Sequence, residues 1–265
     1  MMGFQESLEE HIGLPEPEPE VAEENSHSDT VEVILIHGAG LGSWVWNDVM
    51  PHLNIALLAV DFPGRGKDTL SAKSFRLSDY CDHLLEPIRE WDKTHLILVA
   101  HSIGGVVALK LAGLIKERIV GFIGISAAIP KDGGSFMSTV PFPRRMVMSL
   151  LLRIAGTKPP DSIIVKSLGH DLSDTQRGLV VSQFVPEGSR LYFDKCNSPI
   201  PGVTSWYIRT AQDQEIPLKI QDNMAENLEA LDVRTLESGY LPMLSCPRQL
   251  AASINQFVES IKSEL

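Results

Sequence analysis

Short runs rich in apolar residues alternate with stretches of helical periodicity from residue 30 to the end of the chain. Leu96–Ala100, for example, is a continuous apolar run, which is typical of a strand buried on both faces of a sheet. By contrast, Leu77, Tyr80, Leu84 and Ile88 recur at the spacing of an amphipathic helix. The predicted strands are 31–36, 55–60, 96–100, 119–125, 203–208 and 233–236, and the predicted helices between them are 76–91, 106–114, 218–228 and 247–261.

Strands that are separated by helices pair in parallel through right-handed crossovers. The chain therefore predicts an α/β fold with a mostly parallel central sheet and helices on both of its faces. Functional groups in such sheets gather beyond the carboxyl ends of the strands. His37–Gly40, Asp61–Gly66 and Ser102 all follow predicted strands, so we expect them to converge at that edge.

The pattern changes between about residues 130 and 201, where prolines break the chain into short pieces. Helical spacing returns within this region at 145–154, 162–168 and 174–184. We predict a helical insertion that forms a lid over the strand ends. Its basic residues either form a solvated face or contact an anionic substrate, and they are Arg144, Arg145, Arg153, Lys158 and Lys166.

Charge is distributed unevenly along the 265 residues, whose formal net charge is −11. Residues 1–30 hold nine acidic residues and no lysine or arginine, so the remainder of the chain is close to neutral. We predict a disordered acidic leader over residues 1–29 and one α/β domain over residues 30–265. The leader lacks the basic start and apolar core of a secretory signal. A near-neutral body also argues against nucleic-acid binding, which needs a basic footprint.

Composition limits the compartment and the partners further. No apolar run approaches the roughly 18 residues of a membrane span, and the three cysteines are odd in number and unpatterned. A reducing cytoplasm fits this cysteine usage. The fragment Gly38–Gly42 is too compact for a dinucleotide fingerprint, and no metal-binding cluster stands out. We expect a small-molecule substrate, no cofactor, no metal, no nucleic-acid or membrane partner, and a monomer or homodimer.

The strongest candidate for chemistry is Ser102, on a turn between the predicted strand 96–100 and the helix 106–114. A serine on such a sharp strand-to-helix turn has a strained backbone, so the residues two positions away must be small. They are Ala100 and Gly104 here. This nucleophile elbow places the Ser102 hydroxyl at the edge of the sheet and the Ile103 amide at a helix N-terminus, where it can stabilise an oxyanion.

The order of these motifs resembles the α/β-hydrolase superfamily over roughly residues 31–263. The segment HGAGLGSWVW, from residue 37, and the ending PMLSCPRQL, from residue 242, are most similar to plant methylesterases, hydroxynitrile lyases and related bacterial esterases. The resemblance implies that Ser102 is the nucleophile, that the amides of Ala39 and Ile103 form the oxyanion hole, and that Asp213 is the triad acid.

Asp213 also fits that role from its position alone, because it lies beyond the predicted strand 203–208 and follows the serine in chain order. The alternative role for Asp213 is that of a helix cap, and Asp132 is a weaker rival for the acid.

The third triad member departs from the family pattern, because Tyr240 occupies the position where the resemblance implies a histidine. None of the eight histidines comes after His170. A phenol with a pKa near 10 is neutral at pH 7 and is a poor base there, so ordinary esterase turnover through Ser102 is not expected. Leu241 also replaces the lysine that the lyases carry after this position, which argues against cyanohydrin cleavage.

Three hypotheses follow from the Ser102, Asp213 and Tyr240 constellation. The first is an enzyme without acyl transfer, in which elimination, lyase or cyclisation chemistry on a small apolar carbonyl or ester compound uses Tyr240 as proton donor and Asp213 as base. The second is an esterase with a substitute base, for which His170 in the insertion is the candidate. The third is a small-molecule binding protein without catalysis. We expect the first.

Overall fold

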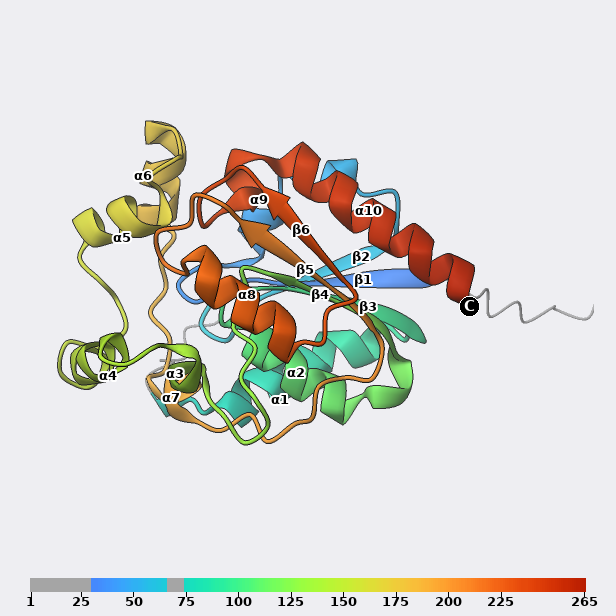
Figure 1. Cartoon of the computed structure of the whole chain (residues 1–265), viewed down its shortest axis with the longest axis horizontal. Helices are drawn as coiled ribbons and strands as arrows, with labels where there is room; N and C mark the ends of the chain where they lie inside the picture. Colours follow the sequence, from blue (N-terminus) through green and yellow to red (C-terminus); the bar gives the residue numbers. More distant parts are fainter. Residues whose placement is uncertain (1–29, 66–73) are drawn as a thin grey trace, which may run out of the picture.

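The computed structural model describes residues 30–65 and 74–265, and its centre is a six-stranded parallel sheet (Figure 1). The strand order β2-β1-β3-β4-β5-β6 changes direction at β1, so the segments that follow β1 and β3 meet beyond adjacent strand ends. The predicted leader over residues 1–29 lies outside the described residues. The strands are β1 (Val31–Ile36), β2 (Leu57–Val60), β3 (His95–His101), β4 (Ile119–Ile125), β5 (Thr204–Thr210) and β6 (Asp232–Leu236).

Two apolar cores, one on each face of the sheet, hold the helices in place. Alternate residues of β3 point to opposite faces, so Leu98 and Ala100 join one core while Ile97 and Val99 join the other. The first core contains side chains of α1 (Leu77–Glu90), α2 (Gly104–Leu114) and α8 (Leu218–Asn227), and the second contains those of α9 (Pro242–Ser245) and α10 (Pro247–Glu264). The α/β fold with helices on both faces is therefore confirmed.

The chain between β4 and β5 forms the helical insertion, which we define as residues 136–193. Figure 1 shows its helices α4, α5 and α6 together at one end of the molecule, at the left of the view. The helices of the insertion are α3 (Phe136–Thr139), α4 (Arg144–Ile154), α5 (Asp161–Leu168), α6 (Asp174–Ser182) and α7 (Arg190–Phe193).

Differences from the predicted elements are confined to their ends and to short turns. The segment 237–245, predicted as a loop, contains the one-turn helix α9, whose first position is Pro242. Helix α10 continues three residues beyond the predicted end at Ile261. The described residues also include the short 3-10 helices η1 (Ser43–Trp46), η2 (Met50–His52) and η4 (Lys116–Arg118). Within the described ranges, no helix has both the length and the apolar character needed to cross a bilayer.

Candidate active site

Ser102 occupies the turn between β3 and α2 with a φ of 54°, a left-handed conformation that serine rarely adopts. Its N–H donates to the Ile125 carbonyl at 3.2 Å, which ties the strained turn to the neighbouring strand. The small residue predicted at position 104 is required, because a Cβ on Gly104 would lie 2.6 Å from the His37 carbonyl oxygen. The strand-to-helix turn thus has the geometry expected of a nucleophile elbow.

Two backbone amides flank the Ser102 hydroxyl. Ala39 follows β1, Ile103 precedes the first residue of α2, and both residues line one cavity with Ser102. Neither amide N–H donates to any acceptor within the part of the chain that the structure describes. Because Ile103 lies at a helix N-terminus, its N–H group carries partial positive charge. A ligand oxygen beside Ser102 therefore has two preorganised donors available.

The cavity beside Ser102 has two chambers, with volumes of about 60 Å³ and about 150 Å³. The smaller chamber extends towards Ile216 and Ile220, and the larger one towards Ile163 and Leu168 of α5. Most of the lining is apolar, which suits a small, largely apolar ligand. The residues shared by both chambers are Ser102, Phe136, Met148, Glu215 and Tyr240.

Tyr240 points its phenol at Ser102, and the phenol O–H donates a hydrogen bond to Ser102 Oγ. Burial raises the pKa of Tyr240 well above its ordinary value, and the bond to Ser102 only partly opposes this rise. The phenol is therefore protonated near neutral pH, so it is suited to donate a proton and not to accept one. The structure brings together two of the three residues of the predicted Ser102, Asp213 and Tyr240 constellation.

Asp213 lies in the loop after β5, but its carboxylate does not contact Tyr240 or Ser102. One oxygen accepts from Ser126 Oγ at 2.5 Å and Thr210 Oγ1 at 3.0 Å, and the other from the N–H groups of Glu215 at 2.7 Å and Ile216 at 2.8 Å. Burial raises the pKa of Asp213, while these hydrogen bonds oppose the rise. The four bonds fix the turn that carries Glu215 into the cavity. Asp132, the other candidate for the triad acid, lines a separate groove that does not include Ser102.

The histidines nearest to Ser102 in the fold have structural partners. His37 Nδ1–H donates to the Gly38 carbonyl at 2.8 Å, and its Nε2 accepts from the Phe62 N–H at 3.1 Å. His101 Nε2–H donates to the Tyr240 carbonyl at 2.9 Å, and its ring packs edge-on against that of Tyr240. Burial lowers the pKa of His101 to about 4 and that of His37 well below its ordinary value, so both rings are neutral.

His170, the predicted substitute base, packs against the backbone of Gly239. A Cβ on Gly239 would lie 2.6 Å from His170 Cε1 and 2.4 Å from Asp171 Oδ1. Asp171 anchors the contact, because its Oδ2 accepts from the Gly239 N–H at 2.6 Å. His170 lines neither chamber beside Ser102.

Glu215 and Arg144 are polar residues of the cavity to which the sequence assigned no catalytic role. Arg144, at the start of α4, donates to the Glu215 carbonyl at 2.8 Å and pairs with its carboxylate at 3.1 Å. Both residues line the smaller chamber, and Glu215 lines the larger one as well. The sequence feature that could have identified Glu215 as a cavity residue is its position, two residues after Asp213 in a loop beyond a strand end.

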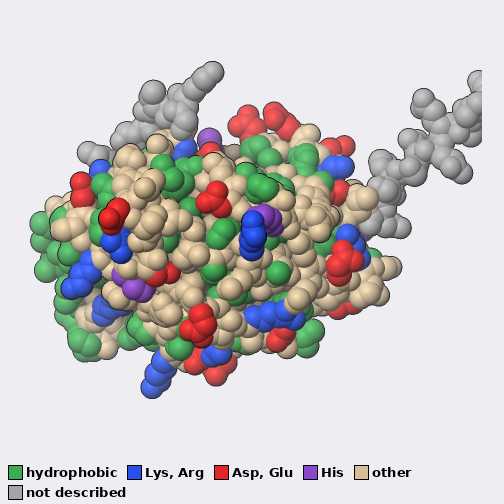
Figure 2. Space-filling model, turned by 90° about the horizontal axis from the view of Figure 1, so that it is seen from above, with side chains coloured by type: hydrophobic (Ala, Val, Ile, Leu, Met, Phe, Trp, Pro, Cys, Tyr) green, Lys and Arg blue, Asp and Glu red, His purple; other side chains and the backbone are tan. Residues whose placement is uncertain are grey.

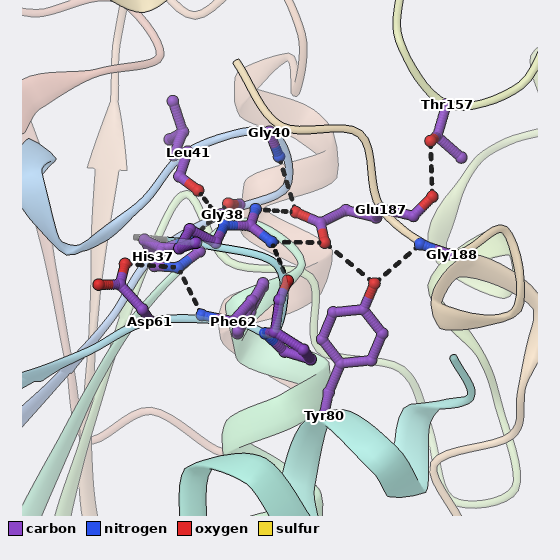
Figure 3. A network of polar contacts seen from close by, with 12 residues as sticks. His37, Gly38, Gly40, Leu41, Asp61, Phe62, Tyr80, Thr157, Glu187 and Gly188 are labelled. Carbon is purple, nitrogen blue, oxygen red and sulfur yellow. Dashed lines mark hydrogen bonds and ion pairs between the residues drawn. The ribbon is translucent and has the colours of Figure 1, made fainter. Parts of the chain in front are cut away.

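A second polar cluster holds the loop after β1, which carries Ala39 and Gly40, against the insertion (Figure 3). The Glu187 carboxylate, nearly fully buried, accepts from the Gly40 N–H at 3.0 Å and the Tyr80 hydroxyl at 3.0 Å, and pairs with both terminal nitrogens of Arg65. The Tyr80 hydroxyl in turn accepts from the Gly188 N–H at 2.8 Å. We call Gly40, Arg65, Tyr80, Glu187 and Gly188 the Glu187 cluster.

The parallel sheet, the elbow and the two amides without an acceptor among the described residues are the features of the α/β-hydrolase fold. Residues 33–253 match the family model described as "Alpha/beta hydrolase family", so the chain belongs to that family. The family that the sequence resembled is thereby confirmed.

Among curated relatives, the chain is similar to Methylesterase 7 of Arabidopsis thaliana, with 24% identity over 251 residues that cover 85% of this chain and 95% of the relative. Its fold is similar to an extracellular alpha/beta-hydrolase from a Paenibacillus species, with a TM-score of 0.76 and 18% identity over 85% of this chain and 98% of that one. Tomato Methylketone Synthase I, solved with 2-tridecanone, has a TM-score of 0.72 and 18% identity, covering 88% of this chain and 99% of that one.

Proposed function

We propose that this protein is an enzyme that forms and protonates an enolate from a small, largely apolar carbonyl compound. The observation that carries the proposal is the hydrogen bond from the Tyr240 phenol to Ser102 Oγ, beside two unpaired amides. A histidine at position 240 would make Ser102 a nucleophile by removing its proton. A neutral phenol has the opposite tendency, because it holds its proton and can deliver it.

The chemistry follows from the positions of the donors. The N–H groups of Ala39 and Ile103 would bind the carbonyl oxygen and stabilise the negative charge that develops on it. When the bond between the α-carbon and its leaving substituent breaks, the electron pair of that bond forms the enolate. Tyr240 would then protonate the carbon, directly or through the Ser102 hydroxyl, and recover its proton from water. An apolar, enclosed cavity strengthens each of these interactions.

A β-keto acid is the simplest substrate of this kind, because loss of carbon dioxide leaves the enolate without any base. Decarboxylation breaks the bond between the α-carbon and the carboxylate, and one proton is taken up to give the ketone. A variant of Methylketone Synthase I was solved with β-ketoheptanoate, at a TM-score of 0.69 to this chain. An apolar chain with a ketone fits the character of both chambers.

Where the reaction needs a base, we propose Glu215 and not Asp213. The Asp213 carboxylate already accepts four hydrogen bonds, whereas the Glu215 carboxylate lies in the cavity wall. Arg144 pairs with the Glu215 carboxylate at 3.1 Å and so orients it at the cavity wall.

The decisive experiment measures carbon dioxide release from β-ketoheptanoate by the full chain. Tyr240→Phe is expected to reduce kcat by about 10²-fold or more, the lower range for loss of a general acid. Tyr207→Phe is the matched control, because Tyr207 is also buried but donates to the Ala127 carbonyl away from the cavity at 2.8 Å. Equal turnover by wild type and Tyr240→Phe, with folding intact, would refute the proposed role of the phenol.

Glu215→Gln separates the two reaction types. Decarboxylation is expected to survive this change within about tenfold, because that step needs no base. Elimination from a β-hydroxy ketone, which requires removal of a proton from carbon, is expected to fall by about 10²-fold or more. A uniform loss of both activities would indicate that Glu215 positions the loop and does not act as a base.

Ester hydrolysis is the second candidate, because the elbow and unpaired amides are those of an acyl-transfer site and the relatives include methylesterases. Hydrolysis of p-nitrophenyl acetate is expected to be weak and to rise at least tenfold in Tyr240→His, which restores an imidazole. The pH profile of that variant is expected to show an inflection near 6.5 that wild type lacks. Normal esterase turnover by wild type, abolished by Ser102→Ala, would favour this candidate over the enolate enzyme.

A further inference from the structure

Helix α4 presents apolar side chains on two opposite faces. Met148 and Leu152 face inward and line the cavity beside Ser102. The outward positions follow the spacing of a single helix face, and each side chain on it is more than half exposed. We call these residues the outer face of α4: Met146, Val147, Leu150, Leu151 and Ile154. Phe142, just before the helix, is 68% exposed and extends the apolar surface.

Basic residues lie close to this apolar surface in the sequence, in a chain that is otherwise acidic. Between residues 133 and 160 there are four basic residues and no aspartate or glutamate. Figure 2 shows hydrophobic side chains at the left end of the molecule, the end that carries α4 in Figure 1, with basic and some acidic side chains among them. The basic residues are Arg145, Arg153 and Lys158, together with Arg144, whose charge is paired with that of Glu215.

We propose that the outer face of α4 docks on an anionic lipid surface. An amphipathic helix with basic residues beside its apolar face lies in the plane of such an interface, where burial of apolar area and attraction to anionic headgroups add together. The earlier expectation of no membrane partner rested on the lack of a spanning segment. A helix that lies on the surface needs no such segment.

Two other occupants of this surface are disfavoured, a second copy of the chain and the acidic segment 1–29. In a two-fold dimer formed through α4, the same arginines of both copies would be brought together, which is unfavourable. The acidic segment 1–29 complements the charge, but its seven large apolar residues are interspersed with nine acidic ones, which would have to be buried with them. A lipid surface supplies both the negative charge and the apolar phase.

Docking through this face would place the cavity close to the lipid. Because Met148 and Leu152 belong to the same helix, a molecule that leaves the lipid reaches the chamber wall within the thickness of one helix. The lipid-docking inference stands on the surface of α4 and does not depend on which reaction occurs at Ser102.

The test is flotation of the full chain with vesicles of phosphatidylcholine alone or with about 30% phosphatidylglycerol. Wild type is expected to bind the anionic vesicles and to release them at high salt. Ile154→Asp is expected to weaken partitioning at least about tenfold, because a charge would have to enter the interface. Leu231→Asp is the matched control, since Leu231 is 74% exposed and Ile154 is 77% exposed.

A second pair of variants tests the charges. Arg145→Glu is expected to weaken binding to anionic vesicles by about fivefold or more, whereas Lys116→Glu, at an exposed lysine beside the far end of α2, is expected to leave it unchanged. Failure of wild type to bind any vesicle would overturn the proposal, as would equal binding by Ile154→Asp and Leu231→Asp. Concentration-dependent dimers that Ile154→Asp abolishes would assign the face to a second copy instead.

Discussion

The carboxylate of Glu187 and the hydroxyl of Ser102 lie at the same edge of the sheet, yet they differ in how many of their hydrogen-bonding positions the protein fills. Three residues of the Glu187 cluster, Gly40, Tyr80 and Arg65, donate to or pair with that carboxylate. Ser102 receives one hydrogen bond from Tyr240, and the two amides beside it have no acceptor among the described residues. A buried polar group whose hydrogen bonds are all made within the protein stabilises the fold. Buried donors without a partner in the protein mark a place where a ligand can bind.

Removal of the Glu187 carboxylate is the strongest test of that contrast. Glu187→Ala leaves Arg65 charged, buried and without its partner, so the free energy of unfolding is expected to fall by about 3–5 kcal/mol. Urea denaturation monitored by circular dichroism measures the change. Ser102→Ala, which removes a hydroxyl with a single partner, is the comparison and is expected to change stability by about 1 kcal/mol or less. Similar losses in both variants would remove the distinction.

The buried, neutral histidines next to Ser102 make the free energy of unfolding depend on pH. The folded-state pKa of His101 is about 4 and the unfolded value is about 6.5. Between these values the unfolded chain binds more protons, so the free energy of unfolding falls as the pH is lowered. The contribution of His101 is expected to fall by about 2 kcal/mol between about pH 7 and about pH 5.

His101→Gln keeps a donor for the Tyr240 carbonyl and is expected to flatten the pH dependence of the free energy of unfolding. A smaller decrease at low pH is expected to remain in this variant, because burial also lowers the pKa of His37. Urea denaturation at the two pH values, in both chains, measures the difference. An unchanged slope in His101→Gln would show that the ring is not held neutral.

Arg144 and Glu215 provide the smallest expected effect, because their ion pair is partly exposed to solvent. Arg144→Gln is expected to change the free energy of unfolding by less than about 1 kcal/mol. Thermal unfolding with and without added salt measures it. A larger loss would mean that this pair acts like the Glu187 cluster, and that the insertion depends on it for its position.

The sequence predicted the sheet well, because strands such as 96–100 are continuous apolar runs that can be recognised from neighbouring residues alone. It also predicted that Ser102 and Tyr240 would meet, since each follows a strand whose end lies at one edge. It could not predict the partners of Asp213, which depend on Ser126, 87 residues away in the chain. Nor could it show that Glu215 enters the cavity, because that follows from the turn which Asp213 fixes.

The contact between Val185 and Gly40 couples the insertion to the loop after β1. The Val185 N–H donates to the Gly40 carbonyl at 3.0 Å, and Glu187 bonds to the same loop two residues later, so the chain is fastened there on both sides of Pro186. Residues 185–187 of the insertion and the loop that carries Ala39 therefore form one unit, and a displacement of either would shift the amide that faces a bound ligand.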